Sequence, residues 1–76
     1  MKLTKFRDKL QNPNRKISNF GENMVQRYLE LVSLHFDMGE TKVPEYIKEE
    51  INNMVELLKD GEDKKFFLNI FGSLKN

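Results

Sequence analysis

The side chains with the most reactive chemistry in this 76-residue chain are few and isolated. There is one histidine, His35, and no cysteine, so a cysteine–histidine nucleophile is excluded within one chain. Ser18, Ser33 and Ser73 have no triad context, and the four glycines occur singly, without a glycine-rich phosphate loop. We therefore expect no enzyme activity and no cofactor, and we interpret His35 as a core or interface histidine whose nitrogens are bonded.

Carboxylates form the next group that has the chemistry for a site. Glu45, Glu49 and Glu56 share one face of a predicted helix, and Glu50 lies close to them. Hard cations prefer such oxygen ligands, but the spacing matches no calcium loop. A solvated acidic face accounts for these residues, so we expect no metal site.

Basic residues are concentrated at the N-terminal end. Residues 1–16 carry six of them against Asp8 alone, namely Lys2, Lys5, Arg7, Lys9, Arg15 and Lys16. On a helix, Lys2, Lys5 and Lys9 share a face roughly 100° from an apolar stripe. Such a helix packs by its stripe and still presents its ammonium groups outward. Clusters of this kind bind phosphate backbones. We expect these six residues to bind nucleic acid; the alternative is an ordinary solvated lysine face.

The rest of the chain separates its charges as well. Residues 17–63 carry eleven acidic and four basic side chains, whereas the C-terminal segment is basic. Such an asymmetry suggests an oriented contact with a polyanion or a protein. Lys64 and Lys65 are predicted to form a second nucleic-acid contact. The neighbouring Phe66, Phe67 and Phe71 have the chemistry to stack on bases, but their helical spacing favours the core.

Four helical segments are predicted to position these residues, over about 2–11, 19–38, 44–60 and 63–74. They define an all-α, compact four-helix bundle in a single domain, residues 1–76. Leu3, Phe6 and Leu10 form the stripe of the first helix, which Asn12-Pro13-Asn14 ends.

The second helix is predicted to be central, because its apolar residues cover more than half of its circumference. Asn19 followed by Glu22 predicts its start, and Gly39 predicts its end. Pro44 is expected at the first position of the third helix, and Asp60-Gly61 at its end. The fourth helix is expected to pack through its apolar residues: Phe66, Phe67, Leu68, Ile70, Phe71 and Leu74. Gly21 and Gly72 lie inside helical patterns and predict close helix–helix approach.

Composition restricts the setting of the protein. Without cysteine there is no disulfide, which fits the reducing cytoplasm. The longest apolar run is far short of the ~20 residues that span a bilayer, so we expect no membrane contact. Charges within the first seven residues argue against a signal peptide. From Phe36 to Val43, apolar and polar residues alternate weakly. This segment would have to be a strand if the protein were a ribbon-helix-helix repressor.

Two segments resemble the helicase-and-RNase-D C-terminal (HRDC) module: Val43-Pro44-Glu45-Tyr46-Ile47 and Phe67-Leu68-Asn69-Ile70-Phe71-Gly72-Ser73. That resemblance implies a compact helical bundle that binds nucleic acid through a basic surface. The whole chain also resembles small T-even-type phage proteins associated with the phage's recombination and repair helicase. This second resemblance implies a role near DNA recombination and repair in the cytoplasm of the host cell.

We therefore expect a non-catalytic accessory module in DNA recombination and repair. Its basic N-terminal surface would bind single-stranded or branched DNA with little sequence specificity. The alternative is a protein–protein adaptor that binds a helicase, or that self-associates through the apolar second helix. A monomer or a weak homo-oligomer is compatible with either function.

Overall fold

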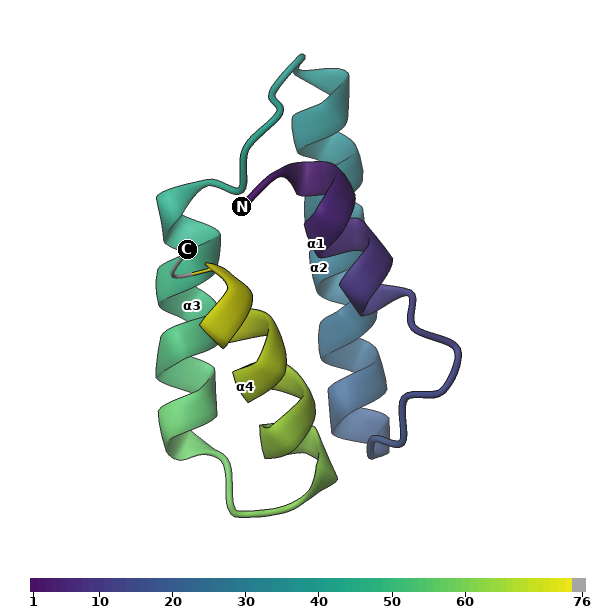
Figure 1. Cartoon of the computed structure of the whole chain (residues 1–76), viewed down its shortest axis with the longest axis vertical. Helices are drawn as coiled ribbons and strands as arrows, with labels where there is room; N and C mark the ends of the chain where they lie inside the picture. Colours follow the sequence, from purple (N-terminus) through teal and green to yellow (C-terminus); the bar gives the residue numbers. More distant parts are fainter. Residues whose placement is uncertain (75–76) are drawn as a thin grey trace.

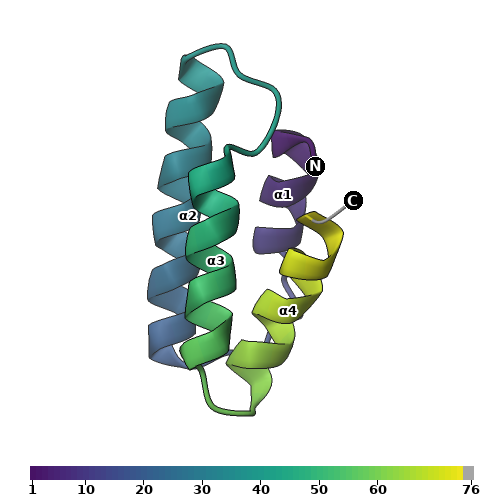
Figure 2. The same cartoon turned by 90° about the vertical axis from the view of Figure 1, so that its left-hand side faces the viewer.

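The computed structural model describes the backbone of residues 1–74 and their side chains, apart from those of Phe71, Ser73 and Leu74. It contains four helices: α1 (Leu3–Leu10), α2 (Asn19–Asp37), α3 (Glu45–Leu57) and α4 (Glu62–Leu74). In both views, α2 and α3 lie beside each other, and α1 and α4 cover one side of that pair (Figures 1 and 2). The expected all-α four-helix bundle is confirmed, with breaks between helices close to the predicted positions.

Tyr28, which is fully buried, connects three of the helices. Its ring centroid lies 6.4 Å from that of Phe6 on α1 and 6.3 Å from that of Phe67 on α4. Burial raises the pKa of the Tyr28 hydroxyl above its usual value, because the phenolate would lose its hydration. The core draws on all four helices and on the loop before α3: Leu3, Phe6, Leu10, Val25, Tyr28, Val32, Val43, Ile47, Ile51, Val55, Phe67 and Ile70.

The N-terminus is fastened to the loop between α2 and α3. The Leu3 amide donates to the Thr41 carbonyl at 2.9 Å, and the Val43 amide donates to the Met1 carbonyl at 3.0 Å. Between these bonds, Lys2 and Lys42 form an isolated antiparallel bridge. No strand occurs among residues 1–74, so the segment that a ribbon-helix-helix fold would need as a strand only fastens α1.

Two helix starts differ from the predicted ones. Ser18, not Asn19, caps α2: its hydroxyl accepts from the Gly21 amide at 3.2 Å. The Ser18 amide donates to Asp63 at 2.7 Å and its hydroxyl also bonds that carboxylate, so α4 fixes where α2 begins. Pro44 precedes α3 as its cap in extended backbone, and the helix begins at Glu45.

The end of α3 also differs. The helix stops at Leu57 because Leu58 adopts extended backbone (ψ 143°) and packs, half-buried, against the core. Gly61 therefore does not terminate the helix, and it has no positive φ. By contrast, Gly39 has φ +79° and provides the left-handed residue after α2, as predicted.

The predicted close approach is confirmed at one of the two helical glycines. A Cβ at Gly21 would come within 3.0 Å of Asp63 Oδ1, whereas a Cβ at Gly72 would meet nothing within 4 Å. The prediction for Gly72 is therefore wrong, because α4 contacts no described neighbour at that point.

The helices bury fewer apolar residues than the width of their apolar stripes in the sequence predicts. Leu68 on α4 is 45% exposed, so it does not pack in the core as predicted. Phe66 and Phe67 do pack there, while the side chains of Phe71 and Leu74 lie outside the described residues. The buried face of a helix covers only about a third of its circumference, so apolar residues at the edges of a wide stripe stay exposed to water. Within residues 1–74, no helix combines the length and apolar character of a membrane span.

We predict that Gly39→Ala lowers the free energy of unfolding by about 1–2 kcal/mol, because an L side chain is strained at φ +79°. Gly61→Ala is the matched control, since that loop glycine has no positive φ and open space around it. Urea denaturation followed by circular dichroism measures both variants. Equal losses in the two would contradict the assigned backbone conformation.

Candidate nucleic-acid interface

The apolar side of α1 is completely buried, which fixes its basic side outward. Leu3, Phe6 and Leu10 are each 0% exposed, whereas Lys5 is exposed and Lys9 half-buried one turn later. Lys2, just before the helix, is also exposed. Among the residues that the structure describes, no carboxylate forms an ion pair with these three lysines. Lys2, Lys5 and Lys9 therefore lie on the outward side of α1, as predicted.

Lys42 joins this group through the bridge to Lys2. The two residues lie directly opposite each other, at a separation where side chains interact, and both are exposed. We call Lys2, Lys5, Lys9 and Lys42 the basic face. Sequence reasoning missed Lys42 because it is isolated among acidic neighbours, and only the backbone pairing brings it to Lys2.

Arg7 lies on the other flank of α1 from Lys5 and Lys9, about 160° around the helix, and contacts α2. Its guanidinium carbon is 5.2 Å from the centroid of the Phe36 ring, a cation–π contact, and its Nε is 3.9 Å from Asp8. Its side chain is 44% exposed, so it retains access to a ligand. Arg7 therefore places a cation over an aromatic ring of α2 that sequence reasoning had not associated with it.

Arg15, in contrast, is bonded to other residues of the protein. Its guanidinium donates to both carboxylate oxygens of Glu22, at 3.2 and 2.9 Å, and its side chain is only 18% exposed. It also donates to the carbonyls of Leu10 and Asn12, at the C-terminal end of α1. These bonds satisfy carbonyls that the helix leaves free and tie the loop to α2. The structure therefore places Arg15 outside the basic face.

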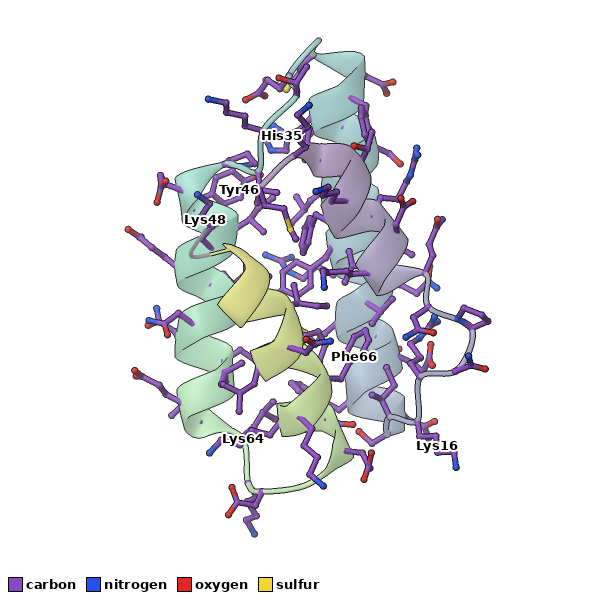
Figure 3. The ribbon with its side chains drawn as sticks, viewed as in Figure 1. Lys16, His35, Tyr46, Lys48, Lys64 and Phe66 are labelled. Atoms are coloured by element: carbon purple, nitrogen blue, oxygen red, sulfur yellow. The ribbon has the colours of Figure 1, made fainter. Side chains whose placement is uncertain are left out.

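The remaining predicted cations lie away from the basic face. Figure 3 shows Lys16 and Lys64 toward the end of the molecule opposite His35, near where α2 and α4 begin. Lys16 borders an open hollow of about 680 Å³. Residues 16–18 line one side of it, and residues 57–63 line the rest. Lys64 lies 3.5 Å from Asp60, and Lys65 is exposed on the same turn. Because carboxylates are interspersed here, this end is mixed in charge and carries no basic face.

His35 is buried at 7% exposure, and both of its ring nitrogens have partners. Nδ1 lies 2.6 Å from Glu40 Oε2, and Nε2 lies 2.5 Å from the Tyr46 hydroxyl. An ionised carboxylate only accepts, so Nδ1 carries a proton, and in the neutral ring the Tyr46 hydroxyl donates to Nε2. The reading of His35 as a satisfied, buried histidine is confirmed. Its bonds connect α2, the following loop and the start of α3 (Figure 3).

The acidic residues of α3 form a solvent-facing surface. Glu45, Glu49 and Glu56 are exposed, and Glu45 pairs with Lys48 at 3.3 Å. Glu50 instead crosses to α2, where it lies 2.8 Å from the Arg27 Nε. In the described part of the chain, no three acidic or histidine side chains converge as metal ligands would.

We predict that Arg15→Ala lowers the free energy of unfolding by about 1–3 kcal/mol, because the Glu22 carboxylate and two carbonyls lose the donor that the poorly exposed guanidinium supplies. Lys16→Ala, one residue away and exposed, should change it by less than about 0.5 kcal/mol. Urea unfolding measures both. A smaller loss for Arg15→Ala than for Lys16→Ala would contradict the structural role of Arg15.

Comparisons with known protein families, with curated proteins and with solved structures find no match to this chain. The exposure, contacts and charges of the residues described above are therefore the observations that bear on function. Those residues form a basic face, an arginine (Arg15) that is bonded to Glu22, and an end of the molecule with mixed charge.

Proposed function

We propose that this protein is a non-catalytic module that binds nucleic acid through the basic face, without reading base sequence. One observation carries the proposal: four exposed or half-buried lysines, Lys2, Lys5, Lys9 and Lys42, lie together with no ion-pair partner among the described residues. Phosphates supply the missing counter-charge. A role in recombination and repair, with a helicase as partner, is supported only by the resemblance of the sequence.

The pairing of Lys2 with Lys42 strengthens the case. Like charges directly opposite in an antiparallel pair destabilise it. A neighbouring acidic residue would remove that repulsion, yet neither lysine forms a described ion pair. A bound phosphate removes it as well, and releases the counterions that both partners hold.

The acidic surface of α3 supports a single orientation on a polyanion. α1 and α3 lie apart in both views (Figures 1 and 2). Glu49 and Glu56 are exposed on α3 and would repel phosphates. A nucleic-acid strand is therefore attracted to the α1 side and disfavoured on the α3 side.

We predict that binding of a labelled single strand weakens steeply with salt. Four phosphate contacts give a slope of about −2.8 in a plot of log affinity against log salt. Replacing Lys5 and Lys9 by glutamine should roughly halve that slope, because two contacts are removed. Fluorescence anisotropy between about 50 and 200 mM salt measures the slopes.

The matched control is the double replacement Lys64→Gln/Lys65→Gln, which removes the same charge at the mixed-charge end. We expect its slope to equal that of the unmodified protein. An equal reduction in both double variants would show that net charge, and not the basic face, determines binding. Absence of binding at protein concentrations up to ~100 μM in low salt would refute the proposed function.

Self-association is a second candidate function, favoured by exposed apolar side chains on α2, just after it and on α3. Leu34 on α2 is 51% exposed, Met38 directly after α2 is 62% exposed, and Leu57 on α3 is 87% exposed. A second copy of the chain would bury such residues.

We expect sedimentation equilibrium to give a mass that rises with protein concentration and falls back to that of a monomer in Leu34→Glu. A charged group in the apolar interface would be desolvated without a partner, which opposes the contact. A monomeric mass for the unmodified protein up to millimolar concentration would exclude this second function.

A further inference from the structure

A hollow of about 420 Å³ lies beside the basic face. It is lined by Lys2, Thr4, Phe36, Glu40 and Thr41, which come from the start of α1, the end of α2 and the loop after α2. Its volume falls within the range of ~300–1,000 Å³ that is usual for small-molecule sites. The wall is mixed: one aromatic ring, two hydroxyls, one carboxylate and one ammonium group.

Phe36 provides the apolar surface of this hollow. The ring is half-buried against the core, and the Arg7 guanidinium lies over it at 5.2 Å. Its position on the helix is therefore held from two sides, while part of the ring still lines the hollow. An aromatic ring beside cations, here Arg7 over the ring and Lys2 in the wall of the hollow, is an arrangement against which unpaired bases stack in proteins that bind single strands.

The polar wall of the hollow is also held in place. Glu40 is bonded through Oε2 to His35, which is bonded in turn to Tyr46. Glu40 is nevertheless 42% exposed, and as a carboxylate it accepts hydrogen bonds from amino groups such as those on a base edge. The Thr4 and Thr41 hydroxyls both donate and accept. The hollow thus presents the groups that complement the edge of a nucleobase.

We infer that the hollow holds one unpaired nucleobase against Phe36 and the Arg7 guanidinium that lies over its ring, while the basic face binds the adjoining phosphates. This inference rests on the proposed function and deepens it, because it assigns a single strand as the ligand. A base inside a duplex has both faces stacked and cannot reach the ring without being extruded. Single strands should therefore bind more tightly than duplexes of the same sequence.

The test compares Phe36→Leu with the control Phe20→Leu, in which an exposed phenylalanine on the same helix is changed. The probe is a fluorescein-labelled 12-nucleotide single strand of mixed sequence, measured by anisotropy at low salt. Phe36→Leu should weaken binding about tenfold, the loss expected for one base–aromatic stack, whereas Phe20→Leu should leave it unchanged. Circular dichroism verifies that the variants are folded.

A second readout avoids dependence on the stability of Phe36→Leu. The chain contains no tryptophan, so Phe36→Trp introduces a single tryptophan into the hollow, and its emission can be excited separately from that of the two tyrosines. Stacking with a base should quench its emission on addition of the single strand, but not on addition of inorganic polyphosphate, which carries phosphates without bases. Phe20→Trp serves as the control and should not be quenched.

The outcomes separate this inference from the proposed function. Unchanged single-strand binding in Phe36→Leu, or equal quenching by polyphosphate in Phe36→Trp, would overturn the base site. If binding still required Lys5 and Lys9, the proposed function would stand without it. If the unmodified protein failed to bind the single strand at all, both would fall.

Discussion

A helix of eight residues does not hold its shape alone in water, since helices shorter than about 12–15 residues are marginal. The position of α1 therefore depends on tertiary contacts: Leu3, Phe6 and Leu10 are completely buried, and Tyr28 contacts Phe6 from α2. Backbone bonds to the loop after α2 fasten its start, and Arg15 bonds the carbonyl of Leu10 at its end. The basic face is rigid only because these contacts hold both ends of the helix.

The attachment of the N-terminus to the loop after α2 also determines which charged residues lie together. Pairing the N-terminus with the loop brings Lys42 beside Lys2 and places Glu40 and Thr41 at the border of the hollow. The loop itself is held by His35, which contacts Glu40 with one nitrogen and Tyr46 with the other. One short segment between α2 and α3 thus positions α1, completes the basic face and shapes the proposed base site. Meanwhile, the carboxylates of α3 leave the opposite side unfavourable for a polyanion.

Helical periodicity was sufficient to predict four helices, because the apolar residues of each recur on one face and are separated by Pro13, Gly39 and the Asp60-Gly61 turn. Features that depend on partners distant in sequence were not predictable. Ser18 caps α2 because Asp63, 45 residues later, bonds it. Arg15 resembles any other cation of the basic segment until its distances to Glu22 are known. The place of Lys42 in the basic face likewise follows from tertiary contacts.

We propose that ligand contact is confined to the α1 side of the molecule. This proposal is tested most directly by a ¹H–¹⁵N NMR titration of the protein with a short single strand at low salt. We expect progressive shifts for the amides of residues 2–9 and 40–43 and for Phe36, with residues 45–57 of α3 unaffected. Shifts centred on α3 or on the start of α4, with residues 2–9 unchanged, would contradict it.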